Sequence, residues 1–279
     1  MESLAANMKV LIAKVLEKKG DCPNCKEPLY AWKTKNPDGT ERCPPTCMSC
    51  GFTDLKRKED VMTEKIYNNS LKARTWNFFR NGSMVTNESL FDKDFKTFKA
   101  ENDETKLALE KSHAFVNEIL LGKTTHLVLS GKSGVGKSHL SMSICKEVIK
   151  RSNYDKKCLF INYRELLEQL KKAFNDDVMY KLLHQSLMAD IKTTDLVVID
   201  DLGAELGGSS ANNSSNYNND TLHSIMEARE DKALVVNTNL TGKELQAAYG
   251  ERIVSRIMNN SSGFVSSLNQ TKDKRITGV

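Results

Sequence analysis

Residues 131–138 read GKSGVGKS, a spacing that could hold a polyphosphate. The pattern G-x-x-x-x-G-K-[ST] follows an apolar run typical of a strand and opens a segment with helical periodicity, which is the context this motif needs. Glycines let backbone N–H groups curl around phosphates, and the helix N-terminus adds partial positive charge. A chance glycine-rich turn is the alternative, and the flanking strand and helix argue against it.

Within this loop we expect Lys137 to reach the β- and γ-phosphates of a nucleotide and to act in catalysis, and Ser138 to bind Mg²⁺. The full set of expected nucleotide-binding residues is Gly131, Lys132, Ser133, Gly134, Val135, Gly136, Lys137, Ser138 and His139.

Two acids follow a second apolar run, in DLVVIDDLGAE (195–205). A buried parallel strand that ends in an acid places a carboxylate at the edge of the sheet where the phosphate loop also lies. We expect Asp200 to hold Mg²⁺ and Asp201 to orient and activate the attacking water. A structural helix cap is the alternative role for Asp201. Glu205 is a less favoured water activator because it lies further along the loop.

The next apolar run ends in VVNTN (235–239). A polar side chain there could stand between the acids and the γ-phosphate and respond to its presence. We expect Asn239 to take this role, with Asn237 as the alternative. An asparagine after a strand is also a common turn former.

Two arginines lie four residues apart in YGERIVSRIM (249–258), so they would share one face of a short helix. Arg252 and Arg256 could form a solvated basic face. They could also reach into a site that belongs to another copy of the protein. The spacing alone leaves both interpretations open.

Five of the seven cysteines fall between residues 22 and 50, and four of them form two C-x-x-C turns separated by 21 residues. An odd total without a secretion signal argues against disulfides and for a metal. Paired turns make a tetrahedral zinc site that folds a small module without catalysing a reaction. A hairpin through residues 37–40 would take up the long spacing. The expected Zn²⁺ ligands are Cys22, Cys25, Cys47 and Cys50, with Cys43 as the alternative to Cys47.

The elements that must position these residues alternate from about residue 106 onward, which is typical of a parallel sheet with helices on both faces. The expected strands are 125–131, 157–163, 194–200 and 232–239, and the expected helices are 136–152, 164–174, 177–191 and 220–230.

Outside this region, residues 1–20 have helical spacing with lysines throughout, which predicts an amphipathic helix and not a secretion signal. The Gly/Ser/Asn-rich stretch 206–220 is expected to be a mobile loop. The predicted domain organisation is an N-terminal helix and zinc-binding module over 1–60, a linker over 61–105 and an ATPase domain over 106–279.

Composition narrows the class of protein. With 39% hydrophobic and 28% charged residues, the chain is expected to be globular and not disordered. No apolar run approaches the roughly 18 residues of a membrane span, so we expect no membrane partner and a cytoplasmic location. Residues 1–80 hold 15 basic and 10 acidic residues, and this excess accounts for the net charge of +5. This basic excess is compatible with a nucleic-acid partner or an acidic protein partner and does not distinguish between them.

The P-loop, VVIDDLGAE, NTNLTGKELQAAYGERIVSRI and the cysteine-bearing module together resemble the AAA+ ATPases, and within them the DnaC/DnaI family of bacterial and phage helicase loaders. The resemblance covers most of the chain from about residue 90. It implies an α/β P-loop domain with a central parallel sheet, and ATP hydrolysis at a subunit interface. It also implies that Arg252 is a catalytic finger that completes the ATP site of the adjacent subunit, with Arg256 assisting it or pairing with an acid.

The resemblance further implies an ATP-dependent loader of a DnaB-type hexameric replicative helicase onto single-stranded DNA, which self-associates through its AAA+ domains. The N-terminal module would grip the helicase; Tyr30 and Trp32 could anchor a protein, stack on bases or pack over the zinc turns. A helical extension within 164–191 would contact DNA, where Lys171 and Lys172 are candidates that could equally be solvated.

One departure from the family pattern concerns the second strand-end acid, which is commonly Glu in AAA+ proteins and is Asp201 here. The shorter side chain implies slow hydrolysis. The last 19 residues offer no match to the later basic sensor of the family. An IstB-type transposition ATPase and a weakly hydrolysing, ATP-switched adaptor are the alternative functions.

Overall fold

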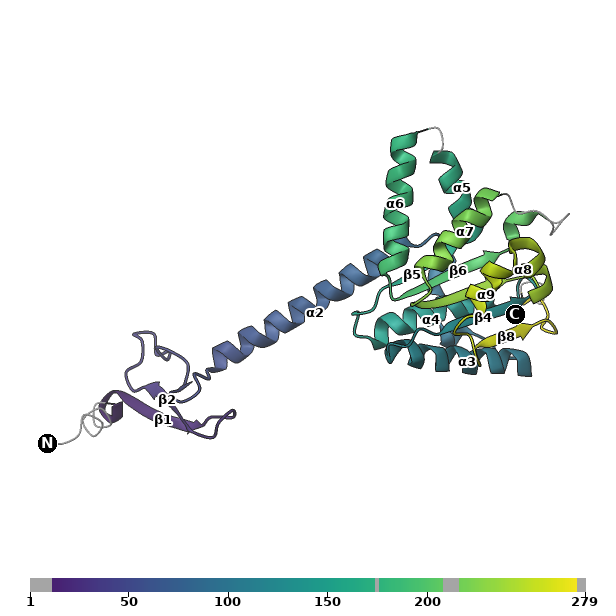
Figure 1. The fold of residues 1–279 in the computed structure, drawn as a ribbon. Coiled ribbons are helices and arrows are strands. Elements are labelled where there is room, and N and C mark those ends of the chain that lie inside the picture. Colours follow the sequence, from purple (N-terminus) through teal and green to yellow (C-terminus); the bar gives the residue numbers. More distant parts are fainter. Residues whose placement is uncertain (1–11, 174–175, 208–215, 275–279) are drawn as a thin grey trace. The chain divides into compact units, whose positions relative to one another are not determined.

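The computed structural model describes residues 12–173, 176–207 and 216–274. The chain divides into two compact units, residues 1–70 and 71–279. Figure 1 labels their helices and strands.

The first unit contains a three-stranded antiparallel sheet. Its strands are β1 (Leu16–Asp21), β2 (Pro28–Trp32) and β3 (Thr46–Cys47), with β2 in the centre. The loop between β2 and β3 holds a turn in which the Asp38 carboxylate accepts hydrogen bonds from both the backbone and the hydroxyl of Thr40. This turn takes up the long spacing between the two C-x-x-C pairs, where the sequence predicts a hairpin.

The prediction of a helix over residues 1–20 is wrong for its last part. Residues 16–21 form strand β1, with Leu16 opposite Trp32 and Asp21 opposite Pro28. The hydrogen bonds that stabilise β1 come from β2, further along the chain, and local periodicity carries no information about such a partner. The first 11 residues of the predicted helix lie outside the described residues.

A long helix, α2 (Asp54–Gly82), begins in the first unit and ends in the second. The stretch expected to be a linker, 61–105, therefore holds most of this helix. After α2, the same stretch holds two short 3₁₀ turns, η1 (Glu88–Asp92) and η2 (Phe95–Thr97), and the first residues of α3 (Asp103–Leu120). Phe79, near the end of α2, is buried in the core of the second unit.

The second unit is built on a five-stranded parallel sheet of order β5-β6-β7-β4-β8. Adjacent strand residues face opposite layers: Leu127 and Leu129 belong to one hydrophobic core and Val128 to the other. The strands are β4 (His126–Gly131), β5 (Cys158–Asn162), β6 (Leu196–Leu202), β7 (Ala233–Thr238) and β8 (Val265–Leu268).

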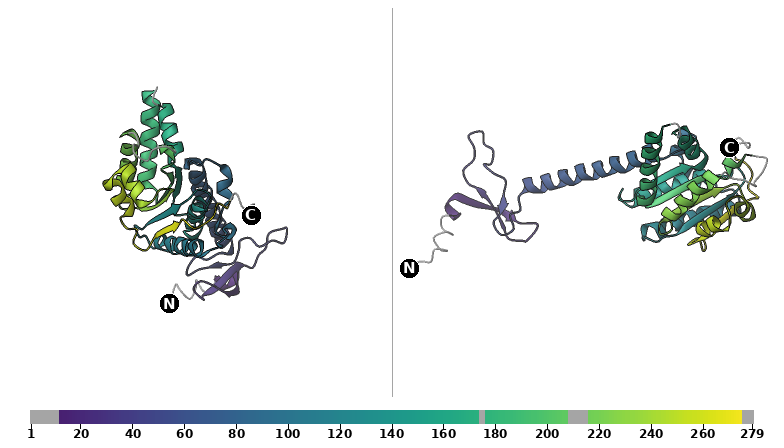
Figure 2. Two further views of the ribbon diagram at one scale, coloured as in Figure 1. Left: turned by 90° about the vertical axis from the view of Figure 1, so that its right-hand side faces the viewer. Right: turned by 45° about the horizontal axis from the view of Figure 1, so that its top comes forward.

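Helices cover both faces of this sheet, as Figures 1 and 2 show. On one face lie α3 and α4 (Lys137–Arg151). On the other lie α5 (Tyr163–Ala173), α6 (Asp177–Thr193), α7 (Asn216–Ala228), α8 (Gly242–Tyr249) and α9 (Glu251–Met258). The predicted fold class, a parallel α/β P-loop domain preceded by a small cysteine-bearing module, is confirmed.

Two local expectations fail. The edge strand β8 is absent from the prediction because VSSL carries little hydrophobic signal, and only its second and fourth residues are buried. The predicted loop 206–220 is helical from Asn216, since Tyr163 donates a hydrogen bond to the Asn218 carbonyl and Asn218 itself is buried. Residues 208–215 of that loop lie outside the described residues. No helix in the described part of the chain is long and apolar enough to cross a membrane.

Candidate functional site

The phosphate loop joins β4 to α4, as the motif predicts. Gly134 and Gly136 adopt positive φ angles of 78° and 104°, which glycine alone adopts without strain. The Lys137 ammonium donates hydrogen bonds to the carbonyls of Gly131 at 2.6 Å and Lys132 at 2.8 Å. The loop thus closes around its own lysine and holds the ammonium at the carboxyl edge of the sheet.

Asp200 lies beneath this loop and is 6% exposed. The Ser138 hydroxyl donates to its carboxylate at 2.9 and 3.0 Å, and the Asn237 amide donates to it at 2.6 Å. Burial raises the pKa of Asp200 to about 6, against the lowering effect of the Asn237 hydrogen bond. A desolvated carboxylate beside a hydroxyl is an oxygen pair that Mg²⁺ prefers, so Ser138 and Asp200 fit this cation.

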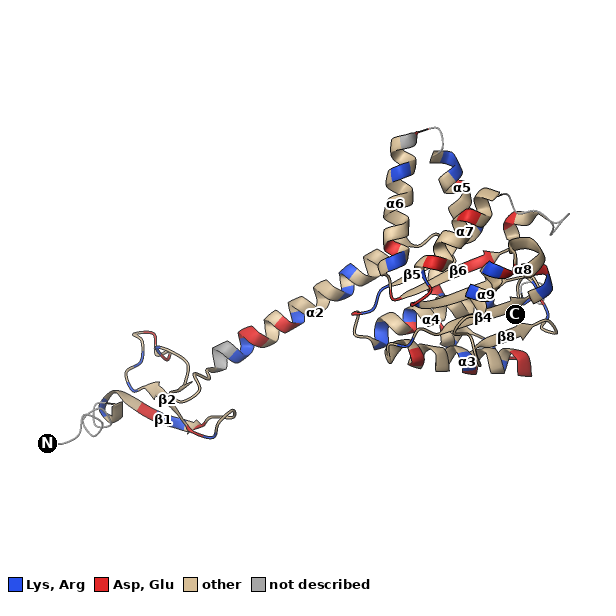
Figure 3. Ribbon diagram, viewed as in Figure 1, with Lys and Arg blue, Asp and Glu red and all other residues tan. Residues whose placement is uncertain are grey.

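Asp201 is turned out of the strand by a bulge. The register between β6 and β7 shifts between Ile199 and Leu202, and Asp201 has a φ of 60°. Bulges redirect side chains near active sites. Here Asp200 is buried and Asp201 is partly exposed, and both line a cavity at this edge of the sheet. In Figure 3 the acidic end of β6 appears in red on a sheet that is otherwise largely uncharged.

Asn237 lies within β7 and Asn239 directly follows it, and the two side chains make different contacts. Asn237 is fully buried between the Ser141 hydroxyl, 2.9 Å away, and Asp200. Asn239 accepts a hydrogen bond from the Lys137 ammonium at 2.6 Å and lies 3.5 Å from the Asp201 carboxylate. Asn239 is therefore the asparagine that contacts both the phosphate-loop lysine and the second acid.

A cavity of about 570 Å³ connects the phosphate loop and both acids to the segment before α3. Sequence reasoning missed this far wall, whose residues include Asn87, Phe98 and Lys274. The Phe98 ring packs edge-on against His139, and the Lys274 ammonium lies 4.3 Å from its centre. Aromatic residues close before the ATPase region are the signal that could have pointed to it.

The arginines of α9 lie outside this cavity. Both approach Glu227 of α7, Arg252 at 3.8 Å and Arg256 at 3.5 Å. The Arg252 side chain is 70% exposed and that of Arg256 is 21% exposed. An ion pair this exposed is worth little, so the Arg252 guanidinium can leave Glu227 for a better partner.

The cysteine cluster lies in the first unit. The sulfur atoms of Cys22, Cys25, Cys47 and Cys50 all lie within 4.8 Å of one another, and three of their separations are 3.4 to 3.6 Å. Tetrahedral zinc with bonds of about 2.3 Å places its sulfurs roughly 3.8 Å apart. The four thiols therefore fit Zn²⁺, and Cys43 is not part of this group.

The two C-x-x-C turns are built alike. The backbone N–H of Lys26 donates to the Cys22 carbonyl, and that of Gly51 donates to the Cys47 carbonyl, both at 2.9 Å. Lys26 and Gly51 also share a left-handed conformation. A hydrogen bond from the Phe52 backbone lowers the pKa of Cys50 to about 6, whereas the hydrogen bond with Cys47 raises that of Cys25, so the thiolate is favoured at Cys50 and not at Cys25.

The family model of the IstB-like ATP binding protein matches residues 58–260, so the cysteine turns lie outside the match. The replicative helicase loader DnaC of Escherichia coli strain K12 is 26% identical over 188 residues, which cover 66% of this chain and 70% of DnaC.

Solved structures give the same relationship at the level of the fold. The DnaC helicase loader superposes with a TM-score of 0.53 and 18% identity, over 65% of this chain and 99% of that one. DnaI superposes with a TM-score of 0.53 and 23% identity, over 66% of this chain and 95% of that one. The resemblance to the DnaC/DnaI proteins that the motifs predict is confirmed.

Proposed function

This chain belongs to the IstB-like ATP-binding protein family, and from that premise we propose that it is an ATP-dependent loader of a DnaB-type hexameric helicase onto single-stranded DNA. ATP binding follows from the family, which implies ATPase activity in general. We further propose that the chain binds the helicase and single-stranded DNA and that it hydrolyses ATP slowly. The observation that carries this proposal is the similarity to DnaC, named a replicative helicase loader, over 188 residues.

ATP would occupy the cavity above the phosphate loop. Lys137 would exchange its bonds to loop carbonyls for the β- and γ-phosphates, and Ser138 with Asp200 would hold Mg²⁺, which supplies charge neutralisation for the phosphates. Because Lys137 now binds Asn239, the arriving γ-phosphate would compete for that contact. Asn239 would then respond to the presence of ATP.

Hydrolysis would use Asp201 and a neighbouring subunit. Asp201 lines the cavity from a bulge and would hold the attacking water. It would accept the water proton as the water oxygen bonds to the γ-phosphorus and the bond from that phosphorus to the leaving ADP breaks. The aspartate reaches less far than a glutamate, which supports slow turnover. Arg252 is exposed and lies outside its own cavity, so it is available to the site of an adjacent copy. Self-association would therefore be needed for hydrolysis.

Single-stranded DNA would be contacted by the helical extension formed by α5 and α6. Lys171 and Lys172 at the end of α5, and Lys181 on α6, are all exposed. The end of α5 and the start of α6 project beyond the sheet in Figure 1, and basic residues are marked on these parts in Figure 3. Contacts between lysines and backbone phosphates stabilise binding to nucleic acid but do not depend on its base sequence.

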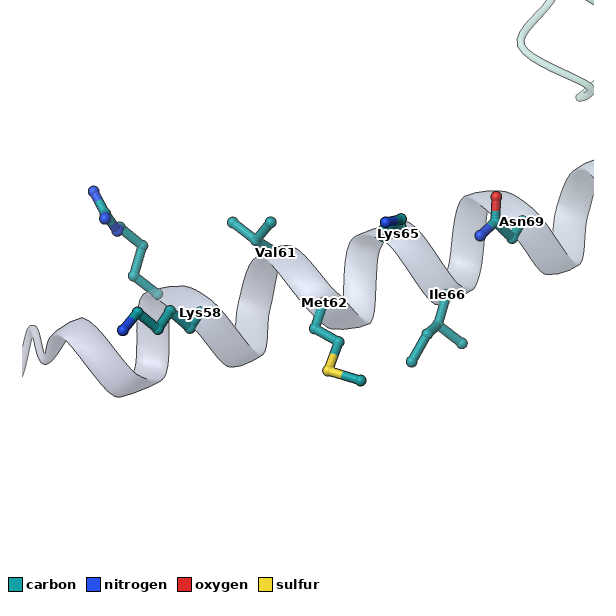
Figure 4. Close-up of a pocket in the computed structure, with 7 residues that line it drawn as sticks. Lys58, Val61, Met62, Lys65, Ile66 and Asn69 are labelled. Atoms are coloured by element: carbon teal, nitrogen blue, oxygen red, sulfur yellow. The ribbon is translucent and has the colours of Figure 1, made fainter.

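The helicase would bind the first unit. In α2, Val61, Met62 and Ile66 are exposed. They lie along the same stretch of helix as Arg57, Lys58 and Lys65. Figure 4 shows Met62 and Ile66 on one side of Lys58 and Lys65, and Val61 on the other. Exposed apolar side chains grouped on one face are typical of protein interaction sites. A zinc ion in the cysteine cluster would stabilise the adjoining sheet without entering the reaction.

The test is native mass spectrometry of the full chain with a DnaB-type hexamer and ATP. We expect a defined helicase–loader assembly. Substitution of Met62→Ser with Ile66→Ser should remove it, whereas Tyr67→Ser, an equally exposed residue of the same helix, should retain it. No assembly, with ATP-dependent filaments on duplex DNA in its place, would identify a transposition ATPase.

A further inference from the structure

Glu205 lies in the turn η3 (Ala204–Leu206), four residues after Asp201, and both its carboxylate oxygens are bound. One oxygen accepts the backbone N–H of Gly203 at 3.0 Å. The other accepts the hydroxyl of Tyr249. Burial raises the pKa of Glu205, while the Tyr249 hydrogen bond opposes that rise. A carboxylate is thus shared between the end of β6 and the end of α8.

The Gly203 end of this link leads to the second acid. Asp201 and Gly203 both have left-handed φ angles, of 60° and 102°. A Cβ at Gly203 would lie 2.7 Å from the Leu240 side chain, so another residue would fit here only if that side chain moved. Strained backbone of this kind persists only when its surroundings hold it. The Glu205 carboxylate supplies one of those restraints, by fixing the N–H two residues after Asp201.

The Tyr249 end leads to the arginine helix. Tyr249 is the last residue of α8 and is 5% exposed. Only Gly250, with a φ of 81°, separates it from α9, which carries Arg252 in its first turn. α8 and α9 also pack against each other. The position of the Tyr249 ring therefore sets where α9 begins and where Arg252 projects.

We propose that Glu205 and Tyr249 are positioning residues that link the water-holding loop of one ATP site to the arginine helix offered to the next subunit. This inference rests on the proposed function, in which Arg252 acts on an adjacent copy. Through this pair, ATP binding at one site would change the position of Arg252 at the adjacent subunit. A shift of Asp201 on ATP binding would move Glu205 and, through Tyr249, the start of α9. Neither residue touches the reacting atoms.

The first measurement is ATP turnover of the full-length Tyr249→Phe variant, which loses only a hydroxyl. Tyr163→Phe is the matched control, because that hydroxyl is also buried but donates its hydrogen bond to the Asn218 carbonyl instead of to Glu205. We expect kcat to fall about tenfold to hundredfold in Tyr249→Phe with KM unchanged, as for a misplaced catalytic group. Equal kcat in the two variants, at matched thermal midpoints, would overturn the link.

The second measurement mixes Lys137→Ala chains with Arg252→Ala chains, each inactive alone. Turnover in the mixture arises where the intact site of an Arg252→Ala chain meets the Arg252 of a Lys137→Ala chain. Adding Tyr249→Phe to the Lys137→Ala chain should lower this turnover, although that chain contributes only its arginine helix. Unchanged turnover would overturn the link alone. A mixture with no turnover would overturn the adjacent-subunit role of Arg252, and this inference with it.

Discussion

The nucleotide site and the cysteine cluster are both small groups of polar side chains, but the chain supports them differently. Around the nucleotide site, two hydrophobic cores hold the sheet whose edge carries the lysine, the acids and the asparagines. In the described part of residues 12–70, the buried hydrophobic residues are Cys22, Ala31 and Cys47. The first site is formed by the fold, whereas in the second the metal would form the fold.

Removal of metal should have the largest effect, and only in the first unit. Structural zinc contributes roughly 10–16 kcal/mol in small domains, and two of the three buried residues there are its proposed ligands. A strong chelator or Cys47→Ser should unfold residues 12–53, as seen in the amide NMR spectrum, while nucleotide affinity is retained. Cys43→Ser should keep one bound zinc per chain by mass spectrometry. Zinc retained in Cys47→Ser would refute the four-cysteine site.

Arg252→Ala should have the next largest effect, and it tests whether the second unit is complete by itself. Loss of an arginine finger lowers kcat about 10³- to 10⁵-fold. ATP affinity should remain, because the guanidinium lies outside the cavity of its own chain. Turnover and equilibrium nucleotide binding measure the two quantities separately. Arg256→Ala is the control, and a loss of ATP affinity in Arg252→Ala would show that the residue serves its own site.

The core of the second unit contains a fully buried cation, Arg229. Its guanidinium donates to the carbonyls of Ile191, Thr194, Asp195 and Ala233 and so ties together the ends of α6, β6 and β7. Arg229→Met leaves these carbonyls without their donor, and we expect roughly 3–5 kcal/mol less stability in urea unfolding. In Arg164→Met, where an exposed pair with Glu168 is lost, the change should stay below about 0.5 kcal/mol.

The smallest effect concerns Asp200, whose carboxylate is buried at a cost in folding free energy before any nucleotide binds. Because the folded pKa of Asp200 is raised to about 6 from an ordinary 3.8, its contribution to stability is present below pH 4 and is lost as pH rises through 6. The loss amounts to at most about 3 kcal/mol. Without nucleotide, Asp200→Asn should therefore gain stability over the parent chain between pH 4 and pH 7 in urea titrations. A pH-independent difference would contradict the raised pKa.

The chemistry of the site could be predicted from local patterns. The P-loop is contiguous, and Asp200, Asp201 and Asn239 each follow an apolar run that parallel pairing brings to the same edge of the sheet. The C-x-x-C turns are likewise local. β8 escaped prediction because its partner β4 is distant in sequence, and β1 because its own side chains are mostly polar.

The amino-acid sequence by itself predicted which groups could bind phosphate, magnesium and zinc, because those properties belong to residue types at short spacing. Only the tertiary structure decided which of them meet. It separated Asn237, which braces Asp200, from Asn239, which contacts Lys137 and Asp201. It also joined Glu205 to Tyr249, 44 residues apart. Such contacts arise from how helices pack on a twisted sheet, and packing depends on the whole chain.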